Sequence, residues 1–403
     1  MSIVVQKYGG SSVASPDKLK QVAKRVLETQ RLGHSVVVVV SAMGKTTDEL
    51  LALSKAICPA PERRELDMLL TAGERISMAL LSMAIRDGGG ESISFTGSQA
   101  GILTNDRHVD AKIIEVRPIR VEDELARGKI VIVAGYQGMS YKREITTLGR
   151  GGSDTTAVAL AAALDAEWCE ICSDVDGVYT ADPRIVPNAK RIPELSYEET
   201  QEMAESGAKV LNAQAVEFAK ESGIAIYARA TSGPLPDDDP TRDGTVVRKF
   251  SPAAPGSVSG VASEKSISLL SAEVDDPGAL LQSMDQLEIG AKQVQILAGD
   301  AGKSQISMVI SNENLHQSET FETKLNDQFG EAAKLSRHFG AVSVIGAGIN
   351  ANHNNLRRGL RILAAFQTRE VFTSSFRITW ILPSGEIEDA VRALHAEFIP
   401  SES

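Results

Sequence analysis

The feature that most constrains this chain is the alternation of short apolar runs with amphipathic stretches over roughly its first 230 residues. Residues 3–6, 36–40 and 130–134 are apolar runs of strand length. Between them, residues 16–32 and 65–86 carry apolar side chains at helical spacing. Apolar strands separated by amphipathic helices predict a mostly parallel sheet that helices cover on both faces. Ligands of such a sheet bind at the carboxyl ends of its strands.

The composition supports a packed chain of two or three domains, because 42% of the 403 residues are hydrophobic and 24% are charged. The net charge of −11 and the 4% of aromatic residues are unfavourable for non-specific binding to nucleic acid or to a membrane surface. The longest strongly apolar run, 36–40, is far shorter than the ~20 residues of a membrane span. We therefore expect neither a nucleic acid nor a membrane as partner.

The cysteines and histidines give no metal pattern. Cys169 and Cys172 form one C-x-x-C, which suits either half a zinc site or a redox pair, but the flanking EWCEICSD is typical of a buried strand. The histidines are scattered without ligand spacing. We favour the buried strand and expect no metal site. Three cysteines cannot form a disulfide framework, and residues 1–10 lack the apolar core of a signal peptide, so we expect a cytoplasmic protein.

Two glycine-rich segments follow strand signals. At Lys7-Tyr8-Gly9-Gly10, a strand delivers a lysine and two glycines ahead of a helix, which suits the binding of a phosphate. The alternative is an ordinary turn with a surface lysine. Residues 149–156, GRGGSDTT, open a second helix, and an arginine in this position can hold a carboxylate with two hydrogen bonds. Here the alternative is a helix start capped by serine and aspartate.

Two further segments carry charged residues that are candidates for ligand binding. The loop 173–184, SDVDGVYTADPR, follows a buried strand and can hold a ribose and an adenine, with Arg184 near the phosphates. Its alternative is a tight turn with solvated charges. Within TAGER, Glu74 is suited to neutralise a substrate ammonium, although an exposed helix glutamate is the commoner case.

The composition changes after Thr231. Residues 233–257 are rich in Pro, Gly, Ser and Asp, which indicates a linker between a catalytic domain at 1–232 and a second region at 258–403. In that region a β-α-β-β-α-β rhythm occurs over about 264–335 and recurs weakly over 340–403. This predicts two small ferredoxin-like modules in tandem.

Together, several segments resemble the motifs of the aspartate kinase family, within the amino-acid kinase superfamily. They occur in the family's order, densely over residues 1–230 and more loosely beyond. The segments are KYGGSS (7–12), SAMGKTTDEL (41–50), TAGERIS (71–77), FTGSQAG (95–101), TTLGRGGSDTTA (146–157), SDVDGVYTADPR (173–184) and SGAKVL (206–211). The resemblance implies an α/β fold, a three-layer sandwich with a mostly parallel central sheet, followed by two ferredoxin-like ACT modules.

The resemblance also implies a reaction and its residues. The reaction is transfer of the γ-phosphoryl group of ATP, with Mg²⁺, to the β-carboxylate of L-aspartate, which is itself the nucleophile. The implied catalytic residues are Lys7, Asp154 and Lys209. The implied nucleotide contacts are Lys7, Gly9, Gly10, Ser173, Asp174, Tyr179, Arg184 and Lys209. The implied substrate contacts are Ser41, Thr47, Glu74, Arg150, Gly151, Gly152 and Ser153.

ACT modules in this family sense end products such as lysine or threonine and pair across subunits, so a homodimer or larger homo-oligomer is expected. The implied effector turn contains Asp275, Pro277, Gly278 and Ala279. Elsewhere the chain departs from the family. Relatives under combined lysine and threonine control have Asn-Ile-Asp-Met-Val-Leu-Gln where this chain has residues 290–296, so an acidic position is Lys292 and an amide position is Ile296. An expected His-Pro-Gly turn is residues 353–355, His-Asn-Asn. We therefore expect altered feedback inhibition.

Two alternatives stay open at this point. One is a superfamily enzyme that acts on glutamate, acetylglutamate, carbamate or a nucleotide; the TAGER segment and the paired C-terminal region argue against it. The other is an amino-acid sensor without catalytic activity, which the presence of Lys7, Arg150, Asp154 and Lys209 argues against.

Overall fold

The structure is a computed structural model that describes residues 2–149, 151–208, 210–235, 239–250, 253–287, 289–299, 302–312 and 318–399. The chain divides into two compact units. The first comprises Met1–Tyr179, Arg191–Ala204 and Lys209–Pro252, and the second comprises Thr180–Lys190, Glu205–Ala208 and Ala253–Ser403. The catalytic domain expected at 1–232 is therefore interrupted twice by short segments that pack with the C-terminal residues.

The first unit is built on the predicted parallel sheet. Its strands lie in the order β10-β12-β11-β9-β1-β2-β6-β3, and the β11–β12 pair is antiparallel. The bounds are β1 Ile3–Tyr8, β2 Ser35–Val40, β3 Ser92–Phe95, β6 Ile130–Ala134, β9 Trp168–Ser173, β10 Glu194–Ser196, β11 Ile226–Ala230 and β12 Gly244–Arg248. Strands β9, β1, β2 and β6 pair in parallel, which puts their carboxyl ends at one edge of the sheet.

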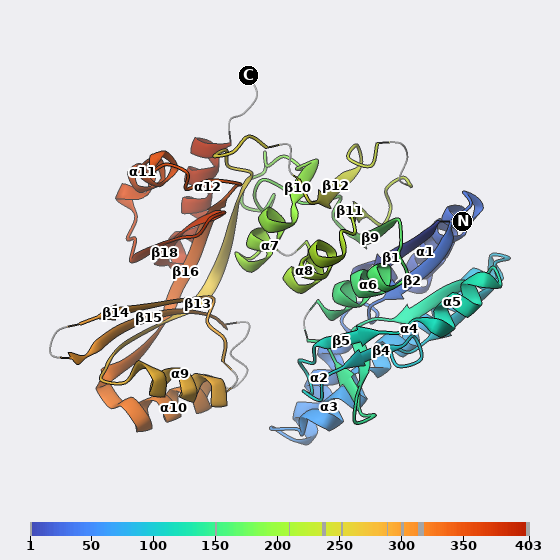
Figure 1. Cartoon of the computed structure of the whole chain (residues 1–403), viewed down its shortest axis with the longest axis horizontal. Helices are drawn as coiled ribbons and strands as arrows, with labels where there is room; N and C mark the ends of the chain where they lie inside the picture. The colour runs from blue at the N-terminus through green and yellow to red at the C-terminus, as the bar shows by residue number, and fades with distance from the viewer. Residues whose placement is uncertain are drawn as a thin grey trace. The chain divides into compact units, whose positions relative to one another are not determined.

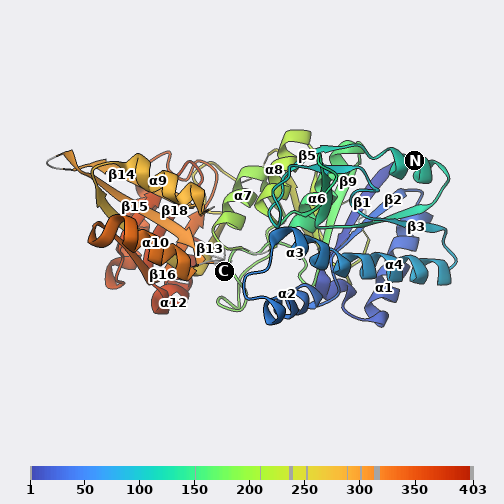
Figure 2. The ribbon, with the colours of Figure 1, turned by 90° about the horizontal axis from the view of Figure 1, so that it is seen from below.

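Helices cover both faces of this sheet, as the apolar strands require. Figure 2 shows α1 (Pro16–Arg31) and α4 (Ala72–Asp87) on one side of the strands and α6 (Gly152–Ala163) and α8 (Ala213–Ser222) on the other. On the α1 side, Val22 and Ile85 pack against Val38 of β2 in one buried cluster. Helix α1 begins where Ser15 accepts a hydrogen bond from the Lys18 amide, ahead of a proline.

The remaining elements of the first unit surround this sandwich. A small sheet has the order β5-β4-β7-β8. Its strands are β4 Ile102–Thr104, β5 Ile113–Val116, β7 Gln137–Ser140 and β8 Ile145–Thr147. The other helices are α2 Thr46–Ile57, α3 Arg63–Leu70, α5 Ile119–Ala126 and α7 Tyr197–Glu205.

The helix predicted at 65–86 is divided at Thr71 into α3 and α4. The side-chain amide of Gln137 donates a hydrogen bond to the Thr71 carbonyl at 3.2 Å, so this carbonyl has a partner outside the helix. By length and composition alone, the run Arg63–Asp87 is apolar enough to cross a membrane. However, 44% of its most apolar window is buried in the protein, and core helices pass the same test, so this is weak evidence for a span.

The expected linker at 233–257 contains a strand of the main sheet. Residues of β12 pair with β11 and with β10, and Val246 and Val247 are buried. The flanking Pro, Gly and Asp residues hide this short apolar run in the composition, so the pattern alone suggested a linker.

The second unit has one sheet with the order β14-β15-β13-β16-β18-β17. Its strands are β13 Gly260–Val274, β14 Gln293–Ala298, β15 Ser304–Ser311, β16 Ala333–Ile345, β17 Glu370–Thr373 and β18 Arg377–Pro383. Its helices are α9 Pro277–Gln286, α10 Ser318–Phe329, α11 Asn354–Ile362 and α12 Ile387–Phe398. Figure 1 shows α9 and α10 beside β14 and β15, and α11 and α12 beside β18.

Both ferredoxin-like modules are present, but they are not in tandem. In the first, β13, α9, β14, β15, α10 and β16 follow one another with strand order β14-β15-β13-β16. The second takes its fourth strand from the start of β13, where residues 260–264 pair with 341–345 of β16. The first module is therefore inserted into the second. Long strands shared by two modules cannot be recognised from a local rhythm, because each half has the length of an ordinary strand.

Candidate active site

The loops predicted to bind ligands meet at the carboxyl edge of the parallel strands. Tyr8 of β1 lies beside Val40 of β2 and Cys172 of β9, and Val40 lies beside Ala134 of β6. These strands thus end at the same level. The segments that follow them begin at Gly9, Ser41, Gly135 and Asp174, and they carry most of the predicted site residues.

Lys7 and Asp154 form an ion pair at this edge, with 2.6 Å between Lys7 Nζ and Asp154 Oδ1. Alternation along β1 directs Lys7 away from Gln6 and Tyr8, toward the face that α6 covers. Asp154 stands in the first turn of α6. Their side chains are 12% and 11% exposed, so the pair is mostly desolvated yet still open to the edge. The Lys7 ammonium, held by one carboxylate at this open edge, can also bind a second anion.

The glycines after β1 allow the loops to approach each other closely. The Gly9 amide donates to the Cys172 carbonyl at 3.2 Å, and the Gly44 amide donates to the Gly10 carbonyl at 3.0 Å. A Cβ atom on Gly10 would lie 2.8 Å from the Ala42 carbonyl oxygen. Any larger residue at position 10 would push the loop after β2 away from Lys7.

Glu74 is a buried carboxylate with one oxygen bound and one available. Its Oε1 accepts a hydrogen bond from the Ala42 amide at 3.0 Å, and its Oε2 has no partner among the described residues. The side chain reaches this position because Gly73 lets α4 approach Ala42. Burial raises the pKa of Glu74 to about 7, and the Ala42 amide opposes this rise only in part. An unpartnered carboxylate oxygen at 3% residue exposure is suited to a ligand ammonium.

The second glycine-rich loop is shaped by left-handed backbone. Gly149 and Gly151 have φ of 75° and 71°, which residues with a Cβ atom rarely adopt. Ser153 lies in the next turn and is buried against the segment that follows β6. The two segments are close, since a Cβ atom on Gly135 would lie only 2.7 Å from Ser153 Oγ. The Gly135 amide in turn donates to the Val40 carbonyl. Gly152 packs on Leu148 at the same turn, while Arg150 lies outside the described residues.

This chain of contacts brings the predicted substrate residues together. Ser41 follows Val40 directly, and its amide donates to the Tyr8 carbonyl at 3.1 Å. Thr47 lies in the first turn of α2, shortly after this loop. Ser41, Thr47, Glu74 and Ser153 are therefore on segments that touch one another at the end of β2.

The predicted nucleotide residues are gathered only in part. The Ser173 hydroxyl accepts a hydrogen bond from the Val175 amide and so shapes the turn after β9, while Asp174 is exposed. The Tyr179 hydroxyl donates to Asp176 at 2.8 Å, which raises the pKa of Tyr179. Arg184 lies in the second unit, where its side chain is 85% exposed and 2.6 Å from Asp182, so its role in nucleotide binding stays a prediction. Lys209 lies outside the described residues.

Sequence reasoning missed Thr231, which follows β11 at the same edge. Its amide and its hydroxyl both donate to the Ser173 carbonyl, at 2.8 and 3.0 Å. Its Oγ1 also lies 2.6 Å from the Ser12 hydroxyl. Thr231 therefore joins the loop after β1 to the loop after β9. The sequence feature that could have identified Thr231 is its position directly after a buried strand.

Asn212 was also missed. Its side-chain oxygen accepts hydrogen bonds from the amides of Gln214 and Ala215 and thereby caps α8. A Cβ on Gly151 would lie 2.2 Å from its Nδ2 atom, so the start of α8 lies against the second glycine-rich loop. The position of Asn212 three residues after Lys209, just ahead of a helix, was a capping signal in the sequence.

A fully buried carboxylate, Asp67 of α3, supports the same loop from behind. It accepts hydrogen bonds from the Thr147 hydroxyl and from the Val109 amide, and one of its oxygens lies 2.6 Å from His108 Nδ1. Val109 has a φ of 72°, which is unusual for a branched residue. Nothing in the sequence pattern separated Asp67 from an ordinary helix aspartate.

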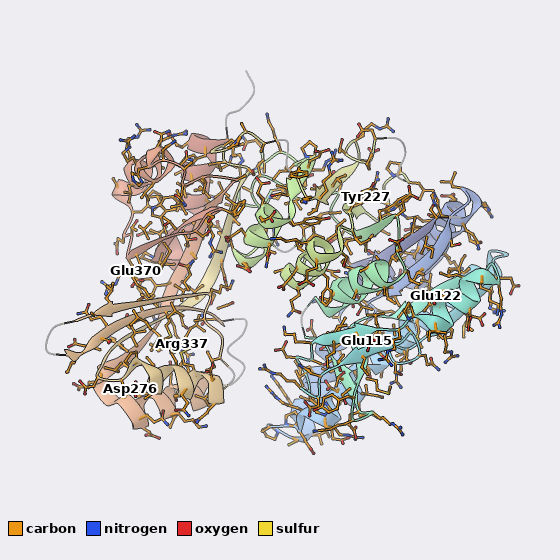
Figure 3. All side chains as sticks on the ribbon, viewed as in Figure 1. Glu115, Glu122, Tyr227, Asp276, Arg337 and Glu370 are labelled. Atoms are coloured by element: carbon orange, nitrogen blue, oxygen red, sulfur yellow. The ribbon has the colours of Figure 1, made fainter. Side chains whose placement is uncertain are left out.

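The predicted effector turn in the second unit is explained by helix capping. Asp276 accepts a hydrogen bond from the Gly278 amide, and Pro277 occupies the first position of α9. Figure 3 shows Asp276 at the start of this helix. Asp275, Gly278 and Ala279 are exposed. A role of this turn in binding an amino acid stays a prediction.

This chain resembles known proteins over most of its length. The model of the amino acid kinase family matches residues 2–228. The aspartokinase of Mycolicibacterium smegmatis is 43% identical over 99% of this chain and 96% of its own length, and that of Corynebacterium glutamicum is 43% identical with the same coverage. The crystal structure of Escherichia coli aspartokinase III with aspartate and ADP covers 98% of this chain and 99% of its own, with a TM-score of 0.84 and 24% identity. This last likeness shows the fold.

Proposed function

Because this chain belongs to the amino acid kinase family, and within it to the aspartokinases, we propose that it phosphorylates the β-carboxylate of L-aspartate. The phosphoryl donor is ATP, which arrives with Mg²⁺, and the products are 4-phospho-L-aspartate and ADP. The observation that carries the proposal is the pairing of Lys7 with Asp154 beside two glycine-rich loops at the carboxyl edge of the sheet.

The proposed reaction needs charge neutralisation and no protein nucleophile. An oxygen of the substrate carboxylate attacks the γ-phosphorus, a new O–P bond forms, and the bond to the β-phosphate oxygen breaks with release of ADP. We assign the Lys7 ammonium to the transferring group. Its ion pair with Asp154 at the sheet edge and the absence of side chains on Gly9 and Gly10 support this role. Asp154 keeps this ammonium in place. The Mg²⁺ travels with the nucleotide phosphates, as is usual for this ion.

Recognition of aspartate divides between an anion and a cation. Glu74 accepts the substrate ammonium on its unpartnered oxygen, and Arg150 with Ser153 holds the α-carboxylate. Ser41 and Thr47 complete the site between the substrate and the phosphates. Ser173, Asp174, Tyr179 and Lys209 are assigned to the nucleotide, and the assignment of Arg184 rests on the resemblance alone.

A trapping assay tests the proposal. Purified protein with MgATP is incubated with hydroxylamine, which converts an acyl phosphate to a coloured hydroxamate. We expect product with L-aspartate and less than a hundredth of that rate with L-glutamate or N-acetylglutamate. Faster turnover of another acid would instead indicate a different member of the superfamily. Binding of amino acids without ADP release from any of them would indicate a sensor.

We also propose that the second unit pairs with a second copy of the chain and senses an amino acid. The edge strand β14 is exposed from Val294 onward and carries Val294 and Ile296 on one face and Leu297 on the other, so apolar side chains are available for a partner. Light scattering behind a sizing column tests for a homodimer or larger homo-oligomer. Titration with lysine, threonine and both tests the effector, and we expect weak or altered inhibition; strong concerted inhibition below 1 mM would contradict it. We place the protein in the cytoplasm, where free thiols persist.

A further inference from the structure

His108 is a partly buried histidine whose ring is fixed by a carboxylate from a helix of the same unit. Its Nδ1 atom lies 2.6 Å from Oδ2 of Asp67, which belongs to α3 and is fully buried. A carboxylate only accepts hydrogen bonds, so Nδ1 carries the proton of this contact. The His108 side chain is 20% exposed, so water competes little for the ring.

The Asp67 carboxylate joins this histidine to two backbone segments. Its Oδ1 atom accepts hydrogen bonds from the Thr147 hydroxyl of β8 at 2.6 Å and from the Val109 amide at 3.1 Å. The same segments are joined directly, because the Ala111 amide donates to the Thr147 carbonyl at 2.9 Å. Burial raises the pKa of Asp67, and the hydrogen bonds from Thr147 and His108 oppose the rise. The Asp67 network is defined as Asp67, His108, Val109 and Thr147.

The backbone is strained where this network holds it. Val109 has a φ of 72°, in the left-handed region that a branched residue rarely adopts. Such a conformation persists only where surrounding contacts fix it, and it is typical of segments that hold a ligand site. Tyr136, with a φ of 67°, is a second such residue, and a Cβ atom on Gly152 would lie 3.1 Å from its ring. Both strained residues therefore lie beside the second glycine-rich loop.

The network fixes the start of that glycine-rich loop from two sides. Thr147 lies two positions before Gly149 in the chain. From the other side, a Cβ atom on Gly149 would lie 3.0 Å from Asp110 Oδ1 and 3.5 Å from the Val109 carbonyl oxygen. The loop leads to Ser153, which is buried at the start of α6 and is assigned above to the substrate α-carboxylate.

We propose that His108 is a positioning residue for the acceptor site. Its N–H group fixes the Asp67 carboxylate, which in turn fixes Thr147 and Val109 on the two sides of Gly149. Groups that bind a ligand must stay within about 0.5 Å of their productive positions, which requires supporting residues that are themselves fixed. The inference rests on the proposed function, because that function makes aspartate the ligand of this loop.

The proposal separates the two substrates. The network contacts the second glycine-rich loop, whereas the nucleotide is assigned mainly to the loops after β1 and β9. Loss of the His108 contact should therefore weaken the binding of aspartate more than that of MgATP. A general loss of stability would affect both substrates alike.

The test compares two histidines of the first unit in the full-length protein. His108→Phe keeps a ring and removes the N–H donor, while His108→Asn keeps an N–H group close to the position of Nδ1. His34→Phe is the matched control, because His34 also uses its Nδ1 atom, 2.7 Å from the Ser2 hydroxyl, and lies just before β2. Steady-state kinetics give the two KM values, and hydrogen exchange measured by mass spectrometry reports the amides of residues 109–112 and 147–149.

For His108→Phe we expect the KM for aspartate to rise about tenfold, which is equivalent to one charged hydrogen bond of about 1.4 kcal/mol. The KM for MgATP should change less than twofold and kcat less than threefold. Exchange in both segments should become about tenfold faster. His108→Asn should stay within threefold of the unsubstituted protein in every quantity, and His34→Phe within twofold.

Thr147→Val removes the hydroxyl donor of the network and keeps the shape of the side chain. It should shift the KM for aspartate and the exchange in the same direction by a smaller factor, and it decides the inference if His108→Phe does not fold. An unaltered KM for aspartate, an equal rise of both KM values, the same loss in His34→Phe, or no recovery in His108→Asn would each overturn the inference. Failure of the unsubstituted protein to phosphorylate aspartate would overturn the proposed function, and the exchange of the two segments would still decide whether His108 holds the loop.

Discussion

The two faces of strand β1 both carry buried charge, and they use it differently. On one face Lys7 pairs with Asp154 at the open edge of the sheet, where each side chain keeps more than a tenth of its exposure. On the other face Glu170 is completely buried, 2.6 Å from Arg25 and 3.8 Å from Arg229, and accepts a hydrogen bond from Gln6 at 2.8 Å. Buried charges thus lie at an open edge on one face of β1 and are enclosed by protein on the other.

The difference lies in what the charges connect. Arg25 also donates to the carbonyls of Gly233 and Pro234, so the enclosed cluster joins α1, β1 and β9 to the chain beyond β11. Removal of one partner there leaves two guanidinium groups without their counter-ion in a dry interior. The Lys7 pair contacts the glycine-rich loops instead. We therefore expect damage to the first cluster to affect folding and damage to the second to affect turnover.

The largest expected effect is on turnover. Lys7→Met should lower kcat by about 10³-fold, because the transferring phosphoryl group loses its main cation. The unfolding temperature should stay within a few degrees, since Asp154 can reach water at the edge. A coupled ADP-release assay and a thermal melt measure the two quantities. Lys24→Met, on the exposed face of α1, serves as control; a kcat within tenfold of the unsubstituted value would remove Lys7 from the mechanism.

On the opposite face, Glu170→Gln should lower the free energy of unfolding by about 3 kcal/mol, because Arg25 and Arg229 are left without a carboxylate. Urea unfolding measures this loss, and the specific activity of the folded fraction should stay within threefold. Glu167→Gln, at an exposed position nearby, controls for the sequence region. If Glu170→Gln lost turnover without losing stability, the contrast between the two faces would be wrong.

Glu74 is a third buried charge, and its substitution tests whether it binds the substrate or only stabilises the fold. Glu74→Gln should raise the KM for aspartate by about 10- to 100-fold, the effect of losing one charged hydrogen bond to a desolvated ammonium. The KM for MgATP should change less than threefold. Glu122→Gln on α5, an exposed residue that Figure 3 labels, is the control. An equal rise of both KM values would point to a disturbed fold instead of a lost ammonium contact.

The pH dependence follows from the same residue. Aspartate binding needs ionised Glu74, whose pKa is raised to about 7 by burial. Below that pH, kcat/KM for aspartate should fall about tenfold per pH unit, and above it the value should level off; Glu74→Gln should abolish this slope. Because the folded pKa lies above the ordinary 4.5, the contribution of Glu74 to the free energy of unfolding is fully present below pH 4.5 and decreases by up to about 3 kcal/mol between pH 4.5 and 7. A flat kcat/KM profile between pH 6 and 8 would contradict the assignment.

The smallest expected effect concerns the C-x-x-C pair, whose members lie on the two faces just compared. Burial raises the pKa of both Cys169 and Cys172 well above the ordinary thiol value. Only Cys58 is exposed among the cysteines, so one thiol should react rapidly with a chromogenic disulfide. A chelator should not change this number. Rapid reaction of more than one thiol in the folded protein would show that the pair is accessible.

The sequence predicted the functional loops better than it predicted the residues that contact those loops. Lys7, Gly9 and Gly10 stood out because a strand, a cation and glycines are adjacent in the chain, and the structure places them together. Thr231 escaped notice because it carries no charge and gains its role only from contacts with Ser12 and Ser173, which lie far away in sequence.

Module boundaries show the same limit. A strand period of two and a helix period of 3.6 revealed both β-α-β-β-α-β patterns. They did not reveal that residues 260–264 complete the second module or that 205–208 pack with the C-terminal unit. Neither segment differs locally from an ordinary strand start or helix end.

What the sequence by itself determined is therefore the class of fold, the positions of the glycine-rich loops and the residue types available at the sheet edge. What only the tertiary structure decided is which charges meet: Lys7 with Asp154, and Glu170 with Arg25. The physical reason is that backbone periodicity is a local property, whereas an ion pair between residues more than 80 positions apart depends on how whole strands and helices pack.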